Sequence, residues 1–177
     1  MLDQFPGFYA ETQTERIYPH GNAAHVLGYI GKVDSNELRQ DLFYTDQDVI
    51  GKTGLEKTYE EFLRGEKGEK WLLFDVHNRA KGKYKEGKED VLPVPGLNIK
   101  TSLDHKLQNY GEALMSNKKG SVVALEPATG EILAYISSPG FDPEVMVGGG
   151  RGEAFEKLKQ DTLDPLFNRP VMAMYPP

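Results

Sequence analysis

The stretch DVIGKTGLEKTYEEFLRG, residues 48–65, contains the clearest helix pattern in the chain. Its apolar side chains recur at the 3.6-residue spacing of an α-helix and predict one buried face over residues 54–64. These side chains are Leu55, Tyr59, Phe62 and Leu63. Gly65 follows where helices commonly end on a residue in the left-handed conformation. The stretch therefore predicts a turn, an amphipathic helix and a glycine cap.

The same stretch contains part of a phosphate-binding loop motif, Gly51-Lys52-Thr53. The complete motif needs a further glycine at position 46, which is Asp46 in this chain, and Asp48 follows. Because two carboxylates in such a loop repel a bound polyanion, we predict no nucleotide site here.

Lys52-Thr53-Gly54 matches one signature of the penicillin-recognising serine enzymes, which also need Ser-x-x-Lys and Ser-x-Asn. The chain has one Ser-x-x-Lys, at Ser116 and Lys119, and it has no Ser-x-Asn. Lys119 lies at the polar end of a predicted helix, where a solvated lysine stays protonated and does not act as a base. We interpret both matches as coincidental and predict no catalytic residue.

The composition limits the kinds of site and partner. The net charge of −6 argues against nucleic acid, and acidic residues interrupt the basic cluster at residues 79–89, which we interpret as a solvated hairpin. The chain has no cysteine, and its four histidines lack metal-ligand spacing, so we predict no metal and no cofactor. No apolar run approaches the roughly 20 residues of a membrane-spanning helix.

Turn residues and apolar patterns predict further elements before the central prolines. Turns are predicted at Pro6-Gly7 and around Pro19, and a strand from about Leu27. Asp34, with a glutamate three residues later, predicts a capped helix that continues to about Phe43. Two strand-like arms surround a predicted turn at residues 78–82.

The second half begins with a connector over residues 92–104 that leads into a predicted strand. An amphipathic helix follows, with an apolar face formed by Leu103, Leu107, Tyr110 and Leu114. Residues 120–139 predict a hairpin around a Pro-Ala-Thr-Gly turn, and residues 153–160 predict a last helix. These elements indicate an α+β fold, with antiparallel strands and a few amphipathic helices in an elongated, two-lobed arrangement.

Five segments together resemble a class B penicillin-binding protein, in the order expected of that family. They are RIYPHGNAAHVLGYIGKV, IGKTGLEKTYEEFLRG, LPVPGLNIKTSLDHKLQNYGEALM, GSVVALEPATGEILAYISSPGFDP and PLFNRPVMAMYPP. The resemblance covers nearly the whole chain, and its YPP ending is similar to the elongation type, penicillin-binding protein 2. It assigns residues 1–98 to the non-catalytic pedestal, or dimerisation domain, and residues 99–177 to the start of the transpeptidase domain.

The resemblance implies a serine D,D-transpeptidase that cross-links peptidoglycan stem peptides and binds beta-lactams. In that family the nucleophile motif follows the two prolines at which this sequence stops, so we expect the chain itself to be structural, not enzymatic. The implied partners of the pedestal are a SEDS-family glycan polymerase and a rod-complex scaffold protein. The implied location is the periplasmic side of the inner membrane, with the parent anchored by an N-terminal helix missing here. A stand-alone binding module with a pedestal-like fold is the alternative.

The resemblance also marks a set of structural motif residues, with no catalytic, cofactor or metal residue among them. They are Arg16, Tyr18, Pro19, Gly51, Gly54, Leu55, Glu56, Tyr59, Leu63, Arg64 and Gly65. Glu56 is expected to favour the start of its helix and to pair with Arg16 or Arg64. Because later strands of the implied sheet are missing, we also expect the chain to self-associate or its C-terminal third to be poorly ordered.

Overall fold

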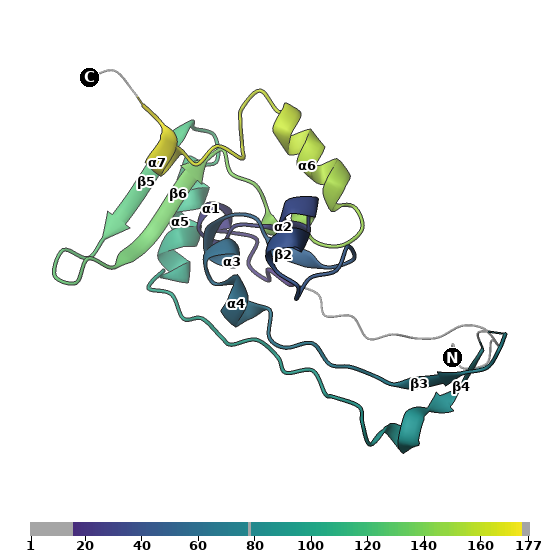
Figure 1. Cartoon of the computed structure of the whole chain (residues 1–177). Coiled ribbons are helices and arrows are strands. Elements are labelled where there is room, and N and C mark those ends of the chain that lie inside the picture. The colour runs from purple at the N-terminus through teal and green to yellow at the C-terminus, as the bar shows by residue number, and fades with distance from the viewer. Residues whose placement is uncertain (1–15, 78, 175–177) are drawn as a thin grey trace.

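The computed structural model describes residues 16–77 and 79–174. Their strands form two-stranded antiparallel sheets, β1–β2, β3–β4 and β5–β6, each separate from the others. Short helices surround the first and third sheets, whereas the second lies at the end of a long arm that projects from the rest of the molecule (Figure 1). The α+β prediction is confirmed.

The N-terminal part contains one element that was not predicted. The turn around Pro19 is present and is closed by the Gly21 N–H, which donates to the Tyr18 carbonyl at 3.0 Å. A short helix, α1 (Ala24–Leu27), then precedes β1 (Ile30–Lys32), so the strand starts three residues later than expected. A short apolar run fits a buried helical turn as well as a strand, and periodicity alone does not separate them.

Two local hydrogen bonds define α2 (Ser35–Gln40), as the sequence predicted. The Asp34 carboxylate accepts from the Glu37 N–H, and the Glu37 carboxylate accepts from the Asp34 N–H, which completes a capping box. The helix ends before Phe43, because Asp41 turns to extended backbone and its side chain accepts from the Phe43 N–H at 2.9 Å. β2 (Val49–Gly51) then pairs with β1.

The predicted helix over residues 54–64 is divided in two. α3 (Gly54–Thr58) and α4 (Glu60–Leu63) meet at Tyr59, whose φ of −112° and ψ of 22° interrupt the helix. The expected apolar face is wrong in part, since Tyr59 is 39% exposed and Phe62 is 53% exposed. The interruption changes the helical phase, and Leu55 and Leu63 are only half-buried.

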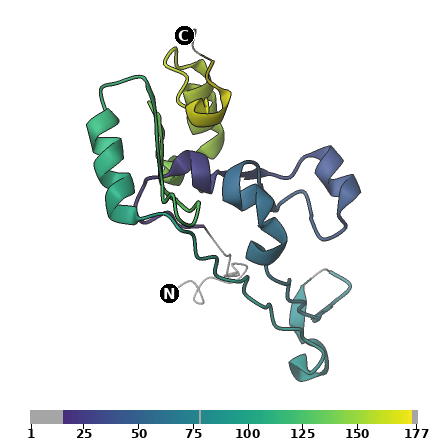
Figure 2. The ribbon, with the colours of Figure 1, turned by 90° about the vertical axis from the view of Figure 1, so that its left-hand side faces the viewer.

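The arm consists of residues 65–98, which run outward and return (Figures 1 and 2). Its strands are β3 (Leu72–Phe74) and β4 (Ala80–Lys83), followed by the 3₁₀ turn η2 (Tyr84–Gly87). The predicted turn at residues 78–82 lies too late, because the Asp75 side chain accepts from the His77 and Arg79 N–H groups at 2.9 Å and closes the turn earlier. Residue 78 itself and the predicted turn at Pro6-Gly7 lie outside the described residues.

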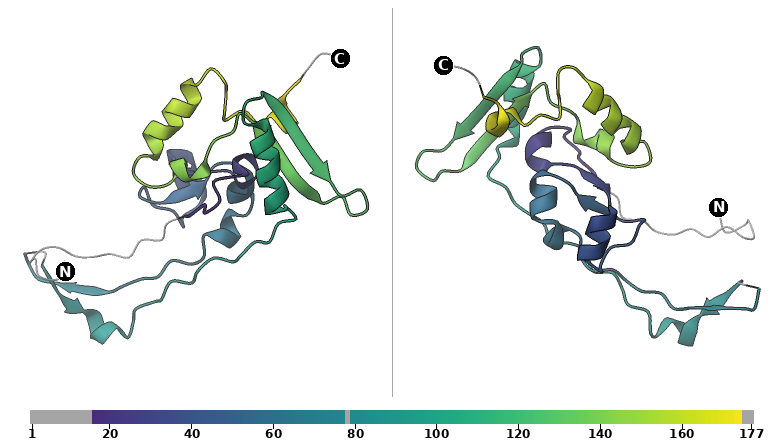
Figure 3. Two further views of the ribbon diagram at one scale, coloured as in Figure 1. Left: turned by 180° about the vertical axis from the view of Figure 1, so that it is seen from behind. Right: turned by 45° about the horizontal axis from the view of Figure 1, so that its top comes forward.

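The C-terminal part is built on α5 (His105–Met115), which lies against the hairpin of β5 (Gly120–Leu125) and β6 (Ile132–Ser138) (Figure 3). The hairpin and the following helices are present, as η3 (Pro143–Met146), α6 (Arg151–Gln160) and α7 (Arg169–Met172). The connector forms no strand between residue 97 and α5. α6 begins two residues before the predicted start.

The apolar face predicted for α5 points away from its own hairpin. Leu107, Tyr110 and Leu114 are exposed, whereas the buried contact is made by Gln108 and by Gly111 against Ile136. Val122, Val123 and Leu125 of β5 are also exposed. The core of the described residues is therefore small. It contains Tyr18, Ala23, Ala24, Ile30, Val33 and Tyr44 in the N-terminal part, and Ala134, Ile136 and Met146 in the C-terminal part.

None of the helices within residues 16–77 and 79–174 is long and apolar enough to cross a membrane.

Candidate functional site

The glycine-lysine-threonine stretch is used for structure in this fold. The Lys52 ammonium donates to Glu37 at 2.6 Å, and the Lys52 N–H donates to the Tyr29 carbonyl at 2.9 Å. Thr53 occupies the N-cap of α3 without a capping bond from its side chain. The Lys52 ammonium is thus held in an ion pair with Glu37, and the lysine serves the local structure of the turn.

The Ser116–Lys119 pair shows no catalytic geometry either. Ser116 ends α5 as its C-cap, and both side chains are exposed. Within the described part of the chain, no hydrogen bond joins them. A nucleophile needs a base within hydrogen-bond reach, so this pair lacks the arrangement for nucleophilic catalysis.

Glu56 forms the centre of the motif residues that the sequence singled out. Its carboxylate is buried and accepts from Arg16 Nε at 3.2 Å and from the Tyr18 hydroxyl at 2.9 Å. Burial, followed by the charge of Glu56, raises the pKa of the Tyr18 phenol, so this hydroxyl remains a donor. Of the two expected arginine partners, Glu56 pairs with Arg16.

This buried cluster joins distant parts of the chain. Arg16 Nη1 also donates to the Leu63 carbonyl at the end of α4, at 3.4 Å. The Tyr18 N–H donates to the Glu144 carboxylate in η3 at 2.7 Å. The cluster therefore connects the segment before α1 to both the α3–α4 pair and the C-terminal part.

Arg64 belongs to a second cluster. Its guanidinium donates to Asp41 at 2.5 Å and stacks on the Phe43 ring with 4.1 Å to the ring centroid. The hydrogen bond from Arg64 lowers the pKa of the Asp41 carboxyl. Next to it, burial raises the pKa of Tyr44 to about 12, and the Tyr44 hydroxyl donates to Glu60 at 3.1 Å. The alternative pairing of Glu56 with Arg64 is not adopted.

Two motif glycines allow the backbone to approach closely at α3. Gly54 has φ of +60°, and a Cβ there would lie 2.5 Å from the Val26 carbonyl oxygen. A Cβ at Gly51 would lie 2.2 Å from the carbonyl of Glu56. Any side chain at either position displaces the helix that carries Glu56, so the glycines determine where the carboxylate lies.

Polar contacts connect the N-terminal segment to α5. Asn22 Nδ2 donates to Asn109 at 2.5 Å, and the Ala23 N–H donates to Glu112 at 2.8 Å. Gln108 is fully buried and exchanges two bonds with the Tyr135 backbone, at 2.9 and 2.8 Å. The parts of the chain before and after the central prolines are thus held together by directional bonds.

Several of these residues were missed at the level of sequence. Glu144, Gln108 and Arg169 each bond to a segment far away, and Arg169 donates to four backbone carbonyls. Glu60 bonds the Gly51 N–H at 2.8 Å, whereas its neighbour Glu61 is exposed. No local pattern separates one glutamate from the next, because their partners are distant in sequence.

A cavity of about 310 Å³ lies between α1, α5 and β6 and includes His25, Glu112, Ser116 and Ser138 in its lining. Burial lowers the pKa of His25, and its Nε2 has no partner among the described residues. Those residues contain no group of three or more His, Cys, Asp or Glu side chains that could hold a metal ion. The cavity thus offers hydrogen-bonding groups without a nucleophile and base in contact.

Comparison with known proteins identifies relatives of this arrangement. The family model described as "Penicillin-binding Protein dimerisation domain" matches residues 1–101. A curated protein of Acinetobacter baumannii, "Peptidoglycan D,D-transpeptidase MrdA", is 39% identical over 98% of this chain. This chain spans 26% of the length of that protein.

Solved structures show the same fold. The "Complex between Penicillin-Binding Protein (PBP2) and MreC from Helicobacter pylori" contains a chain with 33% identity and a TM-score of 0.75. That match covers 95% of this chain and 31% of the other. A structure described as "Structural coordination of polymerization and crosslinking by a peptidoglycan synthase complex" has 28% identity and a TM-score of 0.72, over 95% of this chain and 31% of the other.

Proposed function

Because this chain belongs to the penicillin-binding protein dimerisation-domain family, we propose that it is the pedestal of a peptidoglycan D,D-transpeptidase that acts in cell elongation. The parent enzyme cross-links stem peptides on the periplasmic side of the inner membrane. Residues 1–98 form the pedestal, and residues 99–177 begin the transpeptidase domain. The absence of regular structure between residue 97 and α5 supports this division.

One surface carries the proposal that the pedestal binds partners. We call it the junction surface, and it consists of Phe62 on α4 with Val94 and Leu97 on the returning side of the arm. The Leu97 N–H donates to the Phe62 carbonyl at 2.7 Å, which fixes the arm against α4. All three apolar side chains are exposed. Exposed apolar side chains that a rigid backbone holds together are typical of protein interfaces.

The buried clusters give this surface a rigid base. Arg16 links Glu56 to the Leu63 carbonyl, one residue from Phe62. Beside them, a smaller cavity of about 190 Å³ is lined by Leu55, Leu63 and Leu97 together with their neighbours. A partner side chain that enters this cavity would contact α3, α4 and the arm at the same time.

The implied partners are a rod-complex scaffold protein and a SEDS-family glycan polymerase. The Helicobacter pylori relative was solved as a complex with MreC, which supports the first, and the synthase complex supports the second. We assign the scaffold protein to the junction surface. In this arrangement the pedestal transmits the position of the scaffold to the transpeptidase domain through α5, to which Asn22 and Ala23 are bonded.

The test uses the scaffold protein of the same organism and the 177-residue chain. We expect the double variant Phe62→Ser/Leu97→Ser to weaken binding by at least about tenfold, because it removes two apolar contacts from the centre of the surface. Val171→Ser is the matched control, since Val171 is also an exposed apolar residue but lies on α7, which packs against β5 and β6. Isothermal titration calorimetry measures both. Equal affinities of the double variant and the unchanged chain would refute the assignment.

The enzymatic part of the proposal has a separate test. We expect no covalent label when the chain is treated with a fluorescent penicillin, because no base is hydrogen-bonded to Ser116 among the residues that the structure describes. A label at Ser116 or at any other residue would overturn the proposal that this chain is structural.

A further inference from the structure

The far end of the arm exposes large apolar side chains. We call residues 71–85 the distal hairpin, which comprises β3, its turn and β4 up to the start of η2. Trp71 is 53% exposed, Phe74 is 55% exposed and Val76 at the turn is 96% exposed. Leu73 lies opposite Gly82, where a Cβ would meet no atom within 4 Å, so no cross-strand side chain covers this leucine.

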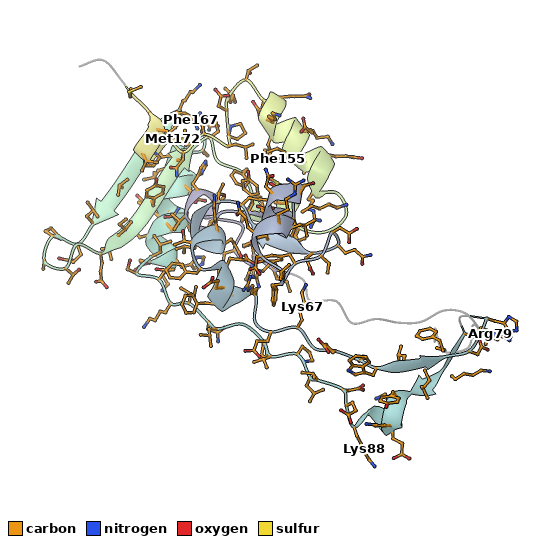
Figure 4. All side chains as sticks on the ribbon, viewed as in Figure 1. Lys67, Arg79, Lys88, Phe155, Phe167 and Met172 are labelled. Carbon is orange, nitrogen blue, oxygen red and sulfur yellow. The ribbon has the colours of Figure 1, made fainter. Side chains whose placement is uncertain are left out.

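The same hairpin is positively charged in an acidic chain. It contains Arg79, Lys81, Lys83 and Lys85 but only one acidic residue, Asp75, so its net charge is +3, and it remains +1 when residues 86–90, with three acidic residues and one lysine, are included, against −6 for the whole chain. Figure 4 shows Arg79 at the far end of the arm, whereas Lys67 lies at its root. Positive charge and apolar surface therefore coincide on the part of the arm that lies farthest from the core.

The ion pairs of these basic residues leave their charges accessible. Arg79 and Lys81 both reach Asp75, at 3.1 and 3.5 Å, so one carboxylate serves two cations. Lys83 reaches Asp90 at 3.8 Å, and Lys85 reaches Glu89 at 2.9 Å. All four basic side chains are more than half exposed. Exposed pairs of this kind hold their partners weakly, so the ammonium groups are free to turn to another anion.

We propose that the distal hairpin docks on the surface of an anionic phospholipid bilayer. Trp71, Leu73, Phe74 and Val76 enter the boundary between headgroups and acyl chains, and the lysines and Arg79 contact lipid phosphates. Tryptophan is favoured at this depth, because its ring is apolar and its indole N–H can still bond to water or headgroups. The apolar side chains and the lysines thus find their two preferred environments at one surface.

The shape of the hairpin favours a lipid surface over a protein partner. Among the described residues β3 pairs with β4, and its neighbouring side chains Leu72 and Leu73, which point to opposite faces, are each 47% exposed. An interfacial element binds a bilayer through buried apolar area together with attraction to anionic lipids, and this hairpin offers both. The proposal goes beyond the function of the junction surface, which uses other residues, and each can fail without the other.

The chain provides its own reporter, since Trp71 is the only tryptophan. The 177-residue chain is titrated with vesicles that contain equal parts of phosphatidylcholine and phosphatidylglycerol. We expect the tryptophan emission to shift to shorter wavelength, and brominated acyl chains to quench it. Vesicles of phosphatidylcholine alone, or added salt, should weaken the response, because the lysine contacts are then lost or screened.

Two sets of variants locate the contact. Leu73→Ser/Phe74→Ser should weaken vesicle binding by at least about tenfold, since two large apolar groups no longer leave water. The double variant could also disturb the pairing of β3 with β4. Val76 lies in the turn, outside both strands, so Val76→Ser tests the apolar contact separately and should also weaken vesicle binding. Lys81→Gln/Lys83→Gln should weaken binding roughly fivefold per lysine. Leu42→Ser and Lys157→Gln/Lys159→Gln are the matched controls, and both should bind as the unchanged chain does.

Three outcomes would overturn the proposal. The first is an unshifted emission in the presence of vesicles that contain phosphatidylglycerol. The second is binding that the lysine variants weaken and the apolar variants leave unchanged, because the hairpin then meets lipid by charge alone. The third is a Trp71 response that appears only when the scaffold protein is added, which identifies a protein surface instead.

Discussion

Glu56 illustrates how a single residue organises this fold. It is a buried carboxylate with two donors, Arg16 and Tyr18, from a segment about 40 residues earlier in the chain. A buried charge is tolerated only when such partners satisfy it, so the three residues depend on one another. The cluster fixes the start of α3 against the segment that leads into α1.

Replacing Glu56 by glutamine should destabilise the fold by about 2–3 kcal/mol, because Arg16 loses its counter-charge in a partly buried place. Urea unfolding followed by circular dichroism gives this free energy. Glu61→Gln on α4 is the control, since Glu61 is exposed and should change stability by less than about 0.5 kcal/mol. If both variants lose the same amount, the cluster does not stabilise the fold as argued.

A second substitution separates this cluster from general charge effects. Once Glu56 is glutamine, Arg16→Gln should destabilise the fold less than it does in the unchanged chain, because the ion pair with Glu56 is already gone and only the hydrogen bond to the Leu63 carbonyl remains to be lost. A cost equal to that of Arg16→Gln in the unchanged chain would contradict the pairing.

At the scale of elements, capping residues link stability to pH. Hydrogen bonds from the Leu107 and Lys106 N–H groups lower the pKa of the Asp104 carboxyl, which is the N-cap of α5. Because the folded pKa lies below the unfolded value of about 3.9, the unfolded state binds the proton first as the pH falls. The stabilisation is therefore fully present above about pH 4 and is lost as the pH falls through the folded pKa.

Asp104→Asn keeps a capping side chain but removes this titration, so its stability should fall less steeply below about pH 4. Unfolding free energies measured in urea at a series of pH values provide the comparison. Asp46→Asn, which removes an exposed carboxylate from a loop, should follow the unchanged chain. If the unfolding free energies of Asp104→Asn and of the unchanged chain fall equally below about pH 4, the ionised Asp104 carboxylate does not stabilise the fold.

The root of the arm depends on Gly65. Its φ is +65°, and a Cβ there would lie 2.2 Å from the Val94 carbonyl oxygen. Gly65→Ala should therefore lower the free energy of local unfolding at the root of the arm by more than about 2 kcal/mol. The loss comes from backbone strain and from breaking the paired hydrogen bonds between Glu66 and Val94. Faster hydrogen exchange of these two amides would report it.

Gly130→Ala is the matched control for backbone strain alone. Gly130 also has positive φ, at +77°, but a Cβ there would meet no atom within 4 Å. We expect Gly130→Ala to lower the free energy of unfolding by about 1 kcal/mol, because alanine is strained at this φ but meets no neighbouring atom. Equal losses at the two glycines would mean that the close approach at the arm root is unimportant.

At the scale of the whole molecule, apolar surface is left uncovered on α5 and β5. β5 pairs with β6 on one side, and Val122, Val123 and Leu125 are exposed. An unpaired, apolar strand edge favours association with another chain. The expectation that this chain self-associates therefore stays a prediction with a defined surface.

Sedimentation velocity should show association that increases with concentration, and Val123→Lys should reduce it, since a charged side chain on an edge strand opposes pairing. Leu42→Lys adds the same charge at an exposed apolar residue on another part of the molecule and should leave association unchanged. A monomer at all concentrations, or equal effects of both lysines, would refute the prediction.

Local sequence predicted much of the secondary structure for a physical reason. The capping box at Asp34, the positive φ of Gly65 and the hairpin at residues 120–139 depend on residues within a few positions of each other. Two local features were still missed: the helix breaks at Tyr59, and the Asp75 side chain closes the turn of the arm earlier than the turn-forming residues at 78–82 indicate.

The sequence by itself determined the α+β class, the caps and turns, the absence of a complete catalytic motif and the family resemblance. Tertiary structure alone decided which arginine pairs with Glu56, because Asp41 and Phe43 engage Arg64 and leave Arg16 to the carboxylate. It also decided which face of α5 is buried. Side-chain burial depends on segments far apart in the chain, whereas hydrogen bonds at caps and turns form between neighbours, so only the latter can be predicted from consecutive residues.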